Sequence, residues 1–100
     1  MDAETLASSV AGNDQPDATL PPPLRALWLA KKGRWDEAHD LSQEIPGSSG
    51  AWIHAWLHRQ EGDYGNACYW YSRAGRPAPR ADAPLDDEWF AIATELSAGS

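Results

Sequence analysis

Apolar residues recur with helical spacing along most of this chain. Leu24, Leu27 and Trp28 fall at positions i, i+3 and i+4, which is typical of a helix with one buried face. From Trp35 to Ile45, apolar residues lie on one side and acidic residues on the other, so a second amphipathic helix is predicted there. Similar spacing predicts helices over residues 50–61, 64–74 and 86–97. No segment alternates with the period of two that marks a strand, so we expect an all-α fold.

Glycine and proline separate these helices. Gly33, Gly62 and Gly75 each follow a helical pattern and are predicted to end it in a left-handed turn. Ser48 or Ser49 can cap the helix that follows Pro46-Gly47, and Asp63 can cap the one that follows Gly62. Residues 76–84 hold three prolines and no periodicity, which predicts an extended loop. The helices therefore form two helical hairpins and a separate closing helix.

The first 21 residues have a different character. They are rich in Ser, Asn, Gln, Asp and Gly, with almost no large apolar residue after Leu6, and they end at a run of prolines. We expect residues 1–21 to be a disordered acidic and Pro-rich tail, because a short helix near Ala3 would have nothing to hold it. Residues 22–97 are then a single helical domain.

Composition and charge narrow the classes of partner. A net charge of −7 repels phosphate backbones and anionic lipid, so neither nucleic acid nor membrane is an expected partner. The apolar runs are too short to span a bilayer. A lone Cys68 excludes an intramolecular disulfide, and the first residues lack the pattern of a secretory signal, so a cytoplasmic location is expected.

Six tryptophans among ten aromatic residues leave two interpretations open. Each large ring can bury about 150–250 Å², so a few of them supply much of a small core. Alternatively, some of the tryptophans lie exposed with arginines and anchor a partner, since Trp, Tyr and Arg dominate interface energetics.

A short pattern occurs twice. Residues 33–38 place a glycine turn before an aromatic residue and a small residue, and residues 62–67 repeat this order. The second copy resembles the tetratricopeptide repeat (TPR), whose turn, small, aromatic, small and proline positions match Gly62-Asp63-Tyr64, Ala67, Tyr71, Ala74 and Pro79. This resemblance covers residues 22–97. It implies a TPR-like stack of two helical hairpins plus a C-terminal capping helix, which binds proteins or peptides in a groove and is not an enzyme. The segment LHRQEGDYGNACYWYSRAG is also similar to small uncharacterised bacterial proteins, which implies no activity.

One row of residues is the best candidate binding site. Asn66, Trp70 and Arg73 share a helix face, where a planar ring beside a guanidinium group can hold a carboxylate. In the alternative, Trp70 packs on the closing helix and Arg73 caps its own helix or pairs with an acid. Our hypothesis is a non-catalytic module for a protein or peptide partner, or for a second copy in a homodimer. Its predicted binding residues, on an exposed or groove side, are Trp52, Trp56, Arg59, Asn66, Tyr69, Trp70 and Arg73.

A second hypothesis concerns His54, His58 and Glu61, which lie at i, i+4 and i+7 on one helix face. Such a row could serve a small-molecule-binding or metal-dependent enzyme. The zinc-protease motif needs Glu after the first His, however, and that position is Ala55. We therefore expect both histidines in the seam between two helices, bonded to Tyr or backbone, with no metal and no cofactor. Cys68 is predicted to lie on a buried stripe, so no catalytic residue is assigned.

Overall fold

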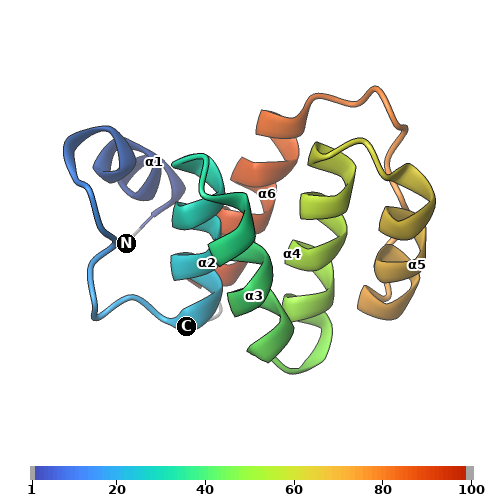
Figure 1. Cartoon of the computed structure of the whole chain (residues 1–100), viewed down its shortest axis with the longest axis horizontal. Coiled ribbons are helices and arrows are strands. Elements are labelled where there is room, and N and C mark those ends of the chain that lie inside the picture. The colour runs from blue at the N-terminus through green and yellow to red at the C-terminus, as the bar shows by residue number, and fades with distance from the viewer. Residues whose placement is uncertain (1, 99–100) are drawn as a thin grey trace.

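The structure, a computed structural model, describes residues 2–98, and these form six helices without a strand (Figure 1). The predicted all-α class is therefore confirmed. The helices are α1 (Ala3–Gly12), α2 (Pro22–Lys31), α3 (Trp35–Glu44), α4 (Gly47–Gln60), α5 (Tyr64–Ala74) and α6 (Leu85–Ala98).

Two helical hairpins, α2 with α3 and α4 with α5, use the same turn. Gly33 and Gly62 have φ angles of 89° and 90°, in the left-handed region that a residue without Cβ adopts most easily. In each turn the amide after the glycine bonds a carbonyl five residues back, Arg34 N to Leu29 O and Asp63 N to His58 O, both at 2.9 Å. This is the Schellman arrangement. The sequence repeat thus has a matching repeat in backbone geometry.

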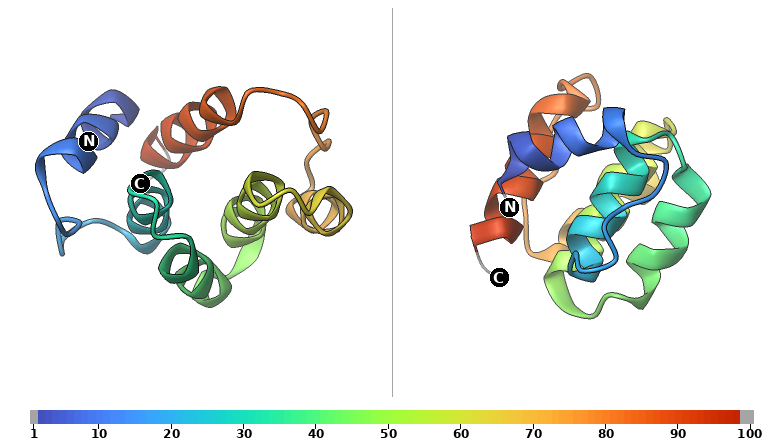
Figure 2. Two further views of the ribbon diagram at one scale, coloured as in Figure 1. Left: turned by 45° about the horizontal axis from the view of Figure 1, so that its top comes forward. Right: turned by 90° about the vertical axis from the view of Figure 1, so that its left-hand side faces the viewer.

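The closing helix α6 returns to the first hairpin. After α5 the chain passes through the predicted loop, and α6 packs against α4, α2 and α1, while α5 lies at the far end of the molecule (Figure 2). Trp89 is 1% exposed, and its indole Nε1 donates a 2.9 Å hydrogen bond to the carbonyl of Leu27. Loop 75–84 therefore carries α6 back across the molecule to cover one side of α4.

The predicted disordered tail is different in the structure. Residues 3–12 form α1, whose buried residues Ala3, Leu6 and Val10 face α2 and α6. Lys32 Nζ also donates to the carbonyl of Val10 at 3.0 Å. This sparse apolar stripe holds the helix because two other helices cover it, which its own composition could not reveal. Met1, at the start of the predicted tail, lies outside the described residues.

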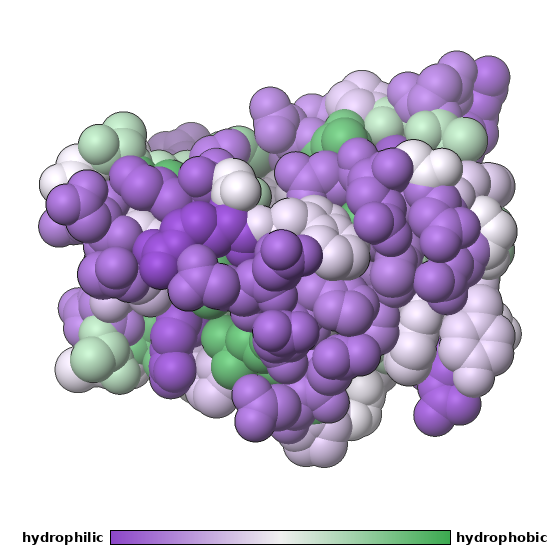
Figure 3. All heavy atoms as spheres, in the orientation of Figure 1, coloured by the Kyte–Doolittle hydropathy of each residue, from purple (hydrophilic) through white to green (hydrophobic). Residues whose placement is uncertain are grey.

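Tryptophan supplies much of the core. Trp28 and Trp89 are among the largest fully buried side chains, and Trp52 and Trp56 are also buried. Tyr69 is the one large hydrophobic residue that is exposed within residues 2–98. The face seen in Figure 3 is mostly hydrophilic with small apolar areas. No described helix has the length and apolar content needed to cross a lipid bilayer.

Candidate functional site

Helix α4 is the centre of the molecule, and residues 51–59 are buried on every side of it. Its polar side chains must therefore find partners on neighbouring helices, since a buried polar group without a hydrogen bond is costly. Arg59 does so toward α6, whereas His54 and His58 do so toward α3 and α5. These two sides of α4 divide the predicted site residues between two environments.

On the α6 side, Arg59 is 5% exposed and forms a closed polar network with Glu88, Tyr71 and Trp52. Arg59 Nη2 lies 2.8 Å from Glu88 Oε1, and Nη1 donates to the carbonyl of Ala83 at 2.7 Å. The hydroxyl of Tyr71 donates to Glu88 at 2.6 Å, and the indole of Trp52 donates to its other oxygen at 3.1 Å. We call this the Arg59–Glu88 network; it joins α4, α5 and α6.

This network corrects part of the predicted binding surface. Trp52, Trp56 and Arg59 were predicted on an exposed or groove side, but they are 6%, 3% and 5% exposed. Helix α6 covers them, and Trp56 Nε1 donates to the carbonyl of Leu85 at 3.0 Å. Burial, together with the bond to Glu88, raises the pKa of Tyr71, which keeps its hydroxyl a donor. These residues serve the core.

On the other side of α4 lies a groove of about 520 Å³, between the end of α3, the start of α4 and α5. Trp70 and Arg73, two members of the best binding candidate from the sequence, lie along one side of it. Arg73 is exposed, and its Cζ lies 5.6 Å from the centre of the Trp70 ring, while its Nη1 donates to the Tyr69 hydroxyl at 3.2 Å. The lining includes Gln43, Ser48, Ala51, His54, Trp70 and Arg73.

The structural alternative for Trp70 and Arg73, packing on the closing helix and pairing with an acid, is not found. Trp70 does not pack on α6 but stacks on His54 at 4.0 Å between ring centres. Within residues 2–98, no carboxylate forms an ion pair with Arg73. Asn66 belongs elsewhere, because it lies in the first turn of α5 beside Asp63, whose carboxylate accepts from its amide at 3.4 Å. The predicted cap of α5 is thereby confirmed.

The start of α4 forms another part of the groove. Helix α4 begins at Gly47, earlier than predicted, so Ser48 and Ser49 lie inside it and no side chain caps its first amides. Ser48 lines the groove. The free N–H groups of a helix start carry a partial positive charge, which adds to the charge of Arg73.

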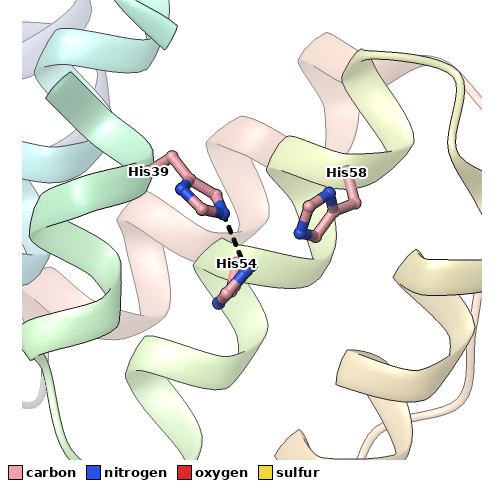
Figure 4. Close-up of side chains that lie close together, drawn as sticks. All are labelled: His39, His54 and His58. Atoms are coloured by element: carbon pink, nitrogen blue, oxygen red, sulfur yellow. Dashed lines mark hydrogen bonds between the residues drawn. The ribbon is translucent and has the colours of Figure 1, made fainter. Parts of the chain in front are cut away.

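Between α3, α4 and α5 lies a cluster of three imidazoles, His39, His54 and His58, which are all the histidines of the chain (Figure 4). One ring nitrogen from each lies within 4.8 Å of the others. A 3.0 Å hydrogen bond joins His39 Nε2 and His54 Nε2. We call these residues the histidine cluster. His39 comes from α3, whereas the other two come from α4.

The surroundings of His54 fix its charge. Its ring lies between Trp70 and His58, stacked on both at 4.0 and 4.7 Å between centres. Burial, with a smaller contribution from the neighbouring His39 and His58, lowers the pKa of His54 to about 4. His54 is therefore neutral at pH 7, with one protonated ring nitrogen and one lone pair.

The outer member of the cluster is tied to an acid. His58 Nδ1 lies 2.6 Å from Glu61 Oε1. A carboxylate in this position accepts a hydrogen bond from Nδ1–H, so the tautomer that it favours has its lone pair on Nε2. The predicted row of His54, His58 and Glu61 does not converge on one point, because Glu61 contacts only the Nδ1 of His58.

Sequence reasoning missed His39 and misplaced the bonds of the other two. His54 and His58 do lie in a seam between helices, as predicted. The expected bonds to Tyr or backbone are wrong, because His54 bonds His39 and His58 bonds Glu61. The spacing of Trp35 and His39, four residues apart, was the available signal in the sequence, because it places both rings on the same face of one helix. In the structure both residues are partly buried, and their rings stack at 4.7 Å.

Cys68 stands apart from both clusters. It is half-buried on α5 rather than fully buried, and it is a free thiol.

Comparison with models of known protein families, with curated proteins and with solved structures found no match. Function must therefore be inferred from the contacts of these residues alone.

Proposed function

We propose that the chain is a TPR-like, non-catalytic binding module that holds an acidic peptide segment of a protein partner in the groove. The observation that carries the proposal is Arg73, an exposed guanidinium that pairs with no described carboxylate and lies beside the ring of Trp70. Arg binds carboxylates through two parallel N–H donors, and a ring beside it gives the aliphatic part of the ligand a surface. The two hairpins with matching glycine turns support the TPR-like assignment.

The dimensions of the groove suit a few side chains of an extended peptide. Its volume of about 520 Å³ is within the range of about 300–1,000 Å³ that small ligand sites occupy. Arg73 and the uncapped start of α4 supply donors, while Ala51 and Trp70 supply apolar contact. A short segment that alternates carboxylates with aliphatic residues would complement both kinds of surface.

The net charge of −7 does not decide against an acidic ligand. Exposed charges separated by more than about 8 Å are largely screened at physiological ionic strength. The charges nearest the groove therefore dominate binding, and these are Arg73 and the start of α4. Selectivity for an acidic over a basic peptide should consequently survive physiological salt.

Fluorescence anisotropy with labelled peptides tests this proposal. The probe is a short capped peptide of alternating glutamate and leucine, and the comparison peptide has lysine in place of glutamate. We expect the acidic peptide to bind more tightly and R73A to weaken it by about tenfold or more, since a hydrogen bond to a charged group contributes about 1.5–3 kcal/mol. The matched control R80A removes an exposed arginine that pairs with Asp82, and should bind as the unsubstituted chain does.

Equal binding of the two peptides, or an unchanged affinity in R73A, would defeat the proposal. Analytical ultracentrifugation of the same proteins tests the other possible occupant of the groove, which is a second copy of the chain. Self-association that R73A abolishes and R80A preserves would assign the groove to a second copy of the chain instead.

A further inference from the structure

The histidine cluster has the composition and the spacing of a metal site. We infer that His39, His54 and His58 bind a divalent transition-metal ion such as Zn²⁺. Imidazole is a preferred ligand of this ion class, and all three histidines of the chain converge from two helices. The inference does not rest on the proposed peptide function, although His54 also lines the groove, because it is argued from the three imidazoles alone.

The distances are close to those of an occupied site. Zinc–nitrogen bonds of about 2.0–2.1 Å in a tetrahedron place two ligand nitrogens about 3.3 Å apart. His39 Nε2 and His54 Nε2 are 3.0 Å apart, and a nitrogen of each ring lies within 4.8 Å of the others. Closing the site requires the nitrogens to approach by up to about 1.5 Å, and the stacked rings of His54 and His58 to tilt until both lone pairs point to one ion.

The protons of the cluster also suit an ion. Without metal, a proton must lie between His39 Nε2 and His54 Nε2, since two bare lone pairs would repel at 3.0 Å. When an ion binds, that proton moves through solvent to Nδ1 of the same ring, and the ion accepts both Nε2 lone pairs. The third ligand is His58 Nε2, because Glu61 accepts the proton on Nδ1. Asn66 Nδ2 is 3.5 Å from this Nε2, too long for a strong competing bond.

The surroundings hold the rings in position. Trp35 stacks on His39, and its Nε1 is fixed by a 2.9 Å bond to the carbonyl of Leu57. Trp70 stacks on the outer face of His54. Glu61 orients His58 in the way that a carboxylate orients a metal-bound imidazole, which typically contributes 10–100-fold to metal affinity. Three protein ligands leave one position on the ion for water.

A second set of groups competes for the same ion, namely His58, Glu61 and Asp63. Both acids of this set are exposed, and Asp63 already caps α5. It shares only His58 with the first set, and Glu61 hydrogen-bonds that residue, so neither His58 nor Glu61 can distinguish the sets. His39 belongs only to the first and Asp63 only to the second.

Equilibrium dialysis of the full, chelator-treated chain against zinc chloride, followed by elemental analysis, tests the inference without any peptide present. We expect one zinc per chain and at least a tenfold loss of affinity in H39Q. The matched variant D63N, which keeps a capping side chain, should bind zinc as the unsubstituted chain does.

Three results would overturn the assignment: no zinc bound at micromolar concentrations, H39Q binding as tightly as the unsubstituted chain, or D63N losing affinity while H39Q keeps it. If circular dichroism in chelator shows that H39Q is unfolded, the imidazole NMR signals of the unsubstituted chain decide. All three histidines must then change on addition of one equivalent of zinc, and a change at His58 alone would exclude the cluster.

Discussion

Helix α4 carries two polar clusters on different sides, and they differ in how completely their groups are bonded. In the Arg59–Glu88 network, the guanidinium donates to Glu88, Tyr71 and a backbone carbonyl, and both oxygens of Glu88 accept hydrogen bonds. In the histidine cluster, the only bond between two members is the 3.0 Å contact of His39 with His54. The first cluster is closed, and the second retains ring nitrogens that can take a ligand.

The difference shows how to interpret polar residues in a small core. A buried charge that has all its partners holds helices together and offers nothing to an incoming group. A neutral imidazole such as His54 costs less to bury than a charge, and its lone pair keeps the capacity to bind an ion. Polarity and burial alone would have grouped Arg59 with His54, whereas the count of hydrogen bonds separates them.

The largest expected effect is on the closed cluster. E88A leaves Arg59 buried without its carboxylate, so the free energy of unfolding should fall by about 3–5 kcal/mol. Urea unfolding followed by circular dichroism measures this loss. The exposed neighbour provides the control, since D87A should change stability by no more than about 0.5 kcal/mol. A loss below about 1 kcal/mol in E88A would show that the network is not structural.

The two clusters should also respond to opposite ends of the pH range. The folded pKa of His54 is lowered to about 4 from 6.5, so the unfolded chain binds the proton more tightly. In chelator, stability should therefore be constant above pH 6.5 and fall by up to about 3 kcal/mol between pH 6.5 and 4. His39, His58 and the exposed Arg73 are the basic groups nearest to His54, and Asp40 approaches only His39.

Tyr71 should determine how stability changes at alkaline pH. Its folded pKa is raised, so stability is intact below its unfolded pKa of about 10 and is lost as the pH rises above it. Urea unfolding at a series of pH values measures both losses of stability. H54Q should reduce the loss of stability between pH 6.5 and 4 and leave the loss at alkaline pH unchanged. An equal loss of stability at acid pH in H54Q would contradict the assignment of this loss to His54.

Zinc should stabilise the fold through the open cluster only. At a free concentration one hundred times the dissociation constant, a ligand of the native state adds about 2.7 kcal/mol to the free energy of unfolding. We expect this gain in the unsubstituted chain and in the D87A control, and its loss in H39Q. A gain of the same size in H39Q, measured by urea unfolding with and without zinc, would place the ion elsewhere.

The smallest effects concern single hydrogen bonds. W52F removes the donor to Glu88 and part of a buried ring, and should cost at least about 1 kcal/mol. R73A changes an exposed side chain without an ion pair among residues 2–98, so its stability should stay within about 0.5 kcal/mol. If R73A were as destabilising as W52F, the groove wall would have a structural role.

Local patterns predicted much of the fold. The glycines at positions 33 and 62 gave the two hairpin turns, and Asp63 gave a helix cap, because these depend on neighbours in sequence. The order of α1 was not predicted, since Leu6 is buried by helices α2 and α6 that lie far along the chain.

The candidate site was only partly predictable for the same reason. Trp70 and Arg73 share a helix face, so their pairing followed from spacing. The burial of Arg59 depends on where the loop after α5 delivers α6, and no local pattern specifies that return. His39 joins His54 only through the packing of α3 on α4. Tertiary contacts therefore decided which polar residues are structural and which are open.

Long-range ¹H–¹⁵N NMR spectra of the imidazole rings and the Arg59 side chain, recorded as one equivalent of zinc is added in the absence of peptide, give the most direct test. If the histidine cluster is open and the Arg59–Glu88 network is closed, the ring nitrogens of His39, His54 and His58 shift together while Arg59 Nε stays unchanged. Histidine signals that do not move, or a shift confined to His58, would contradict this account.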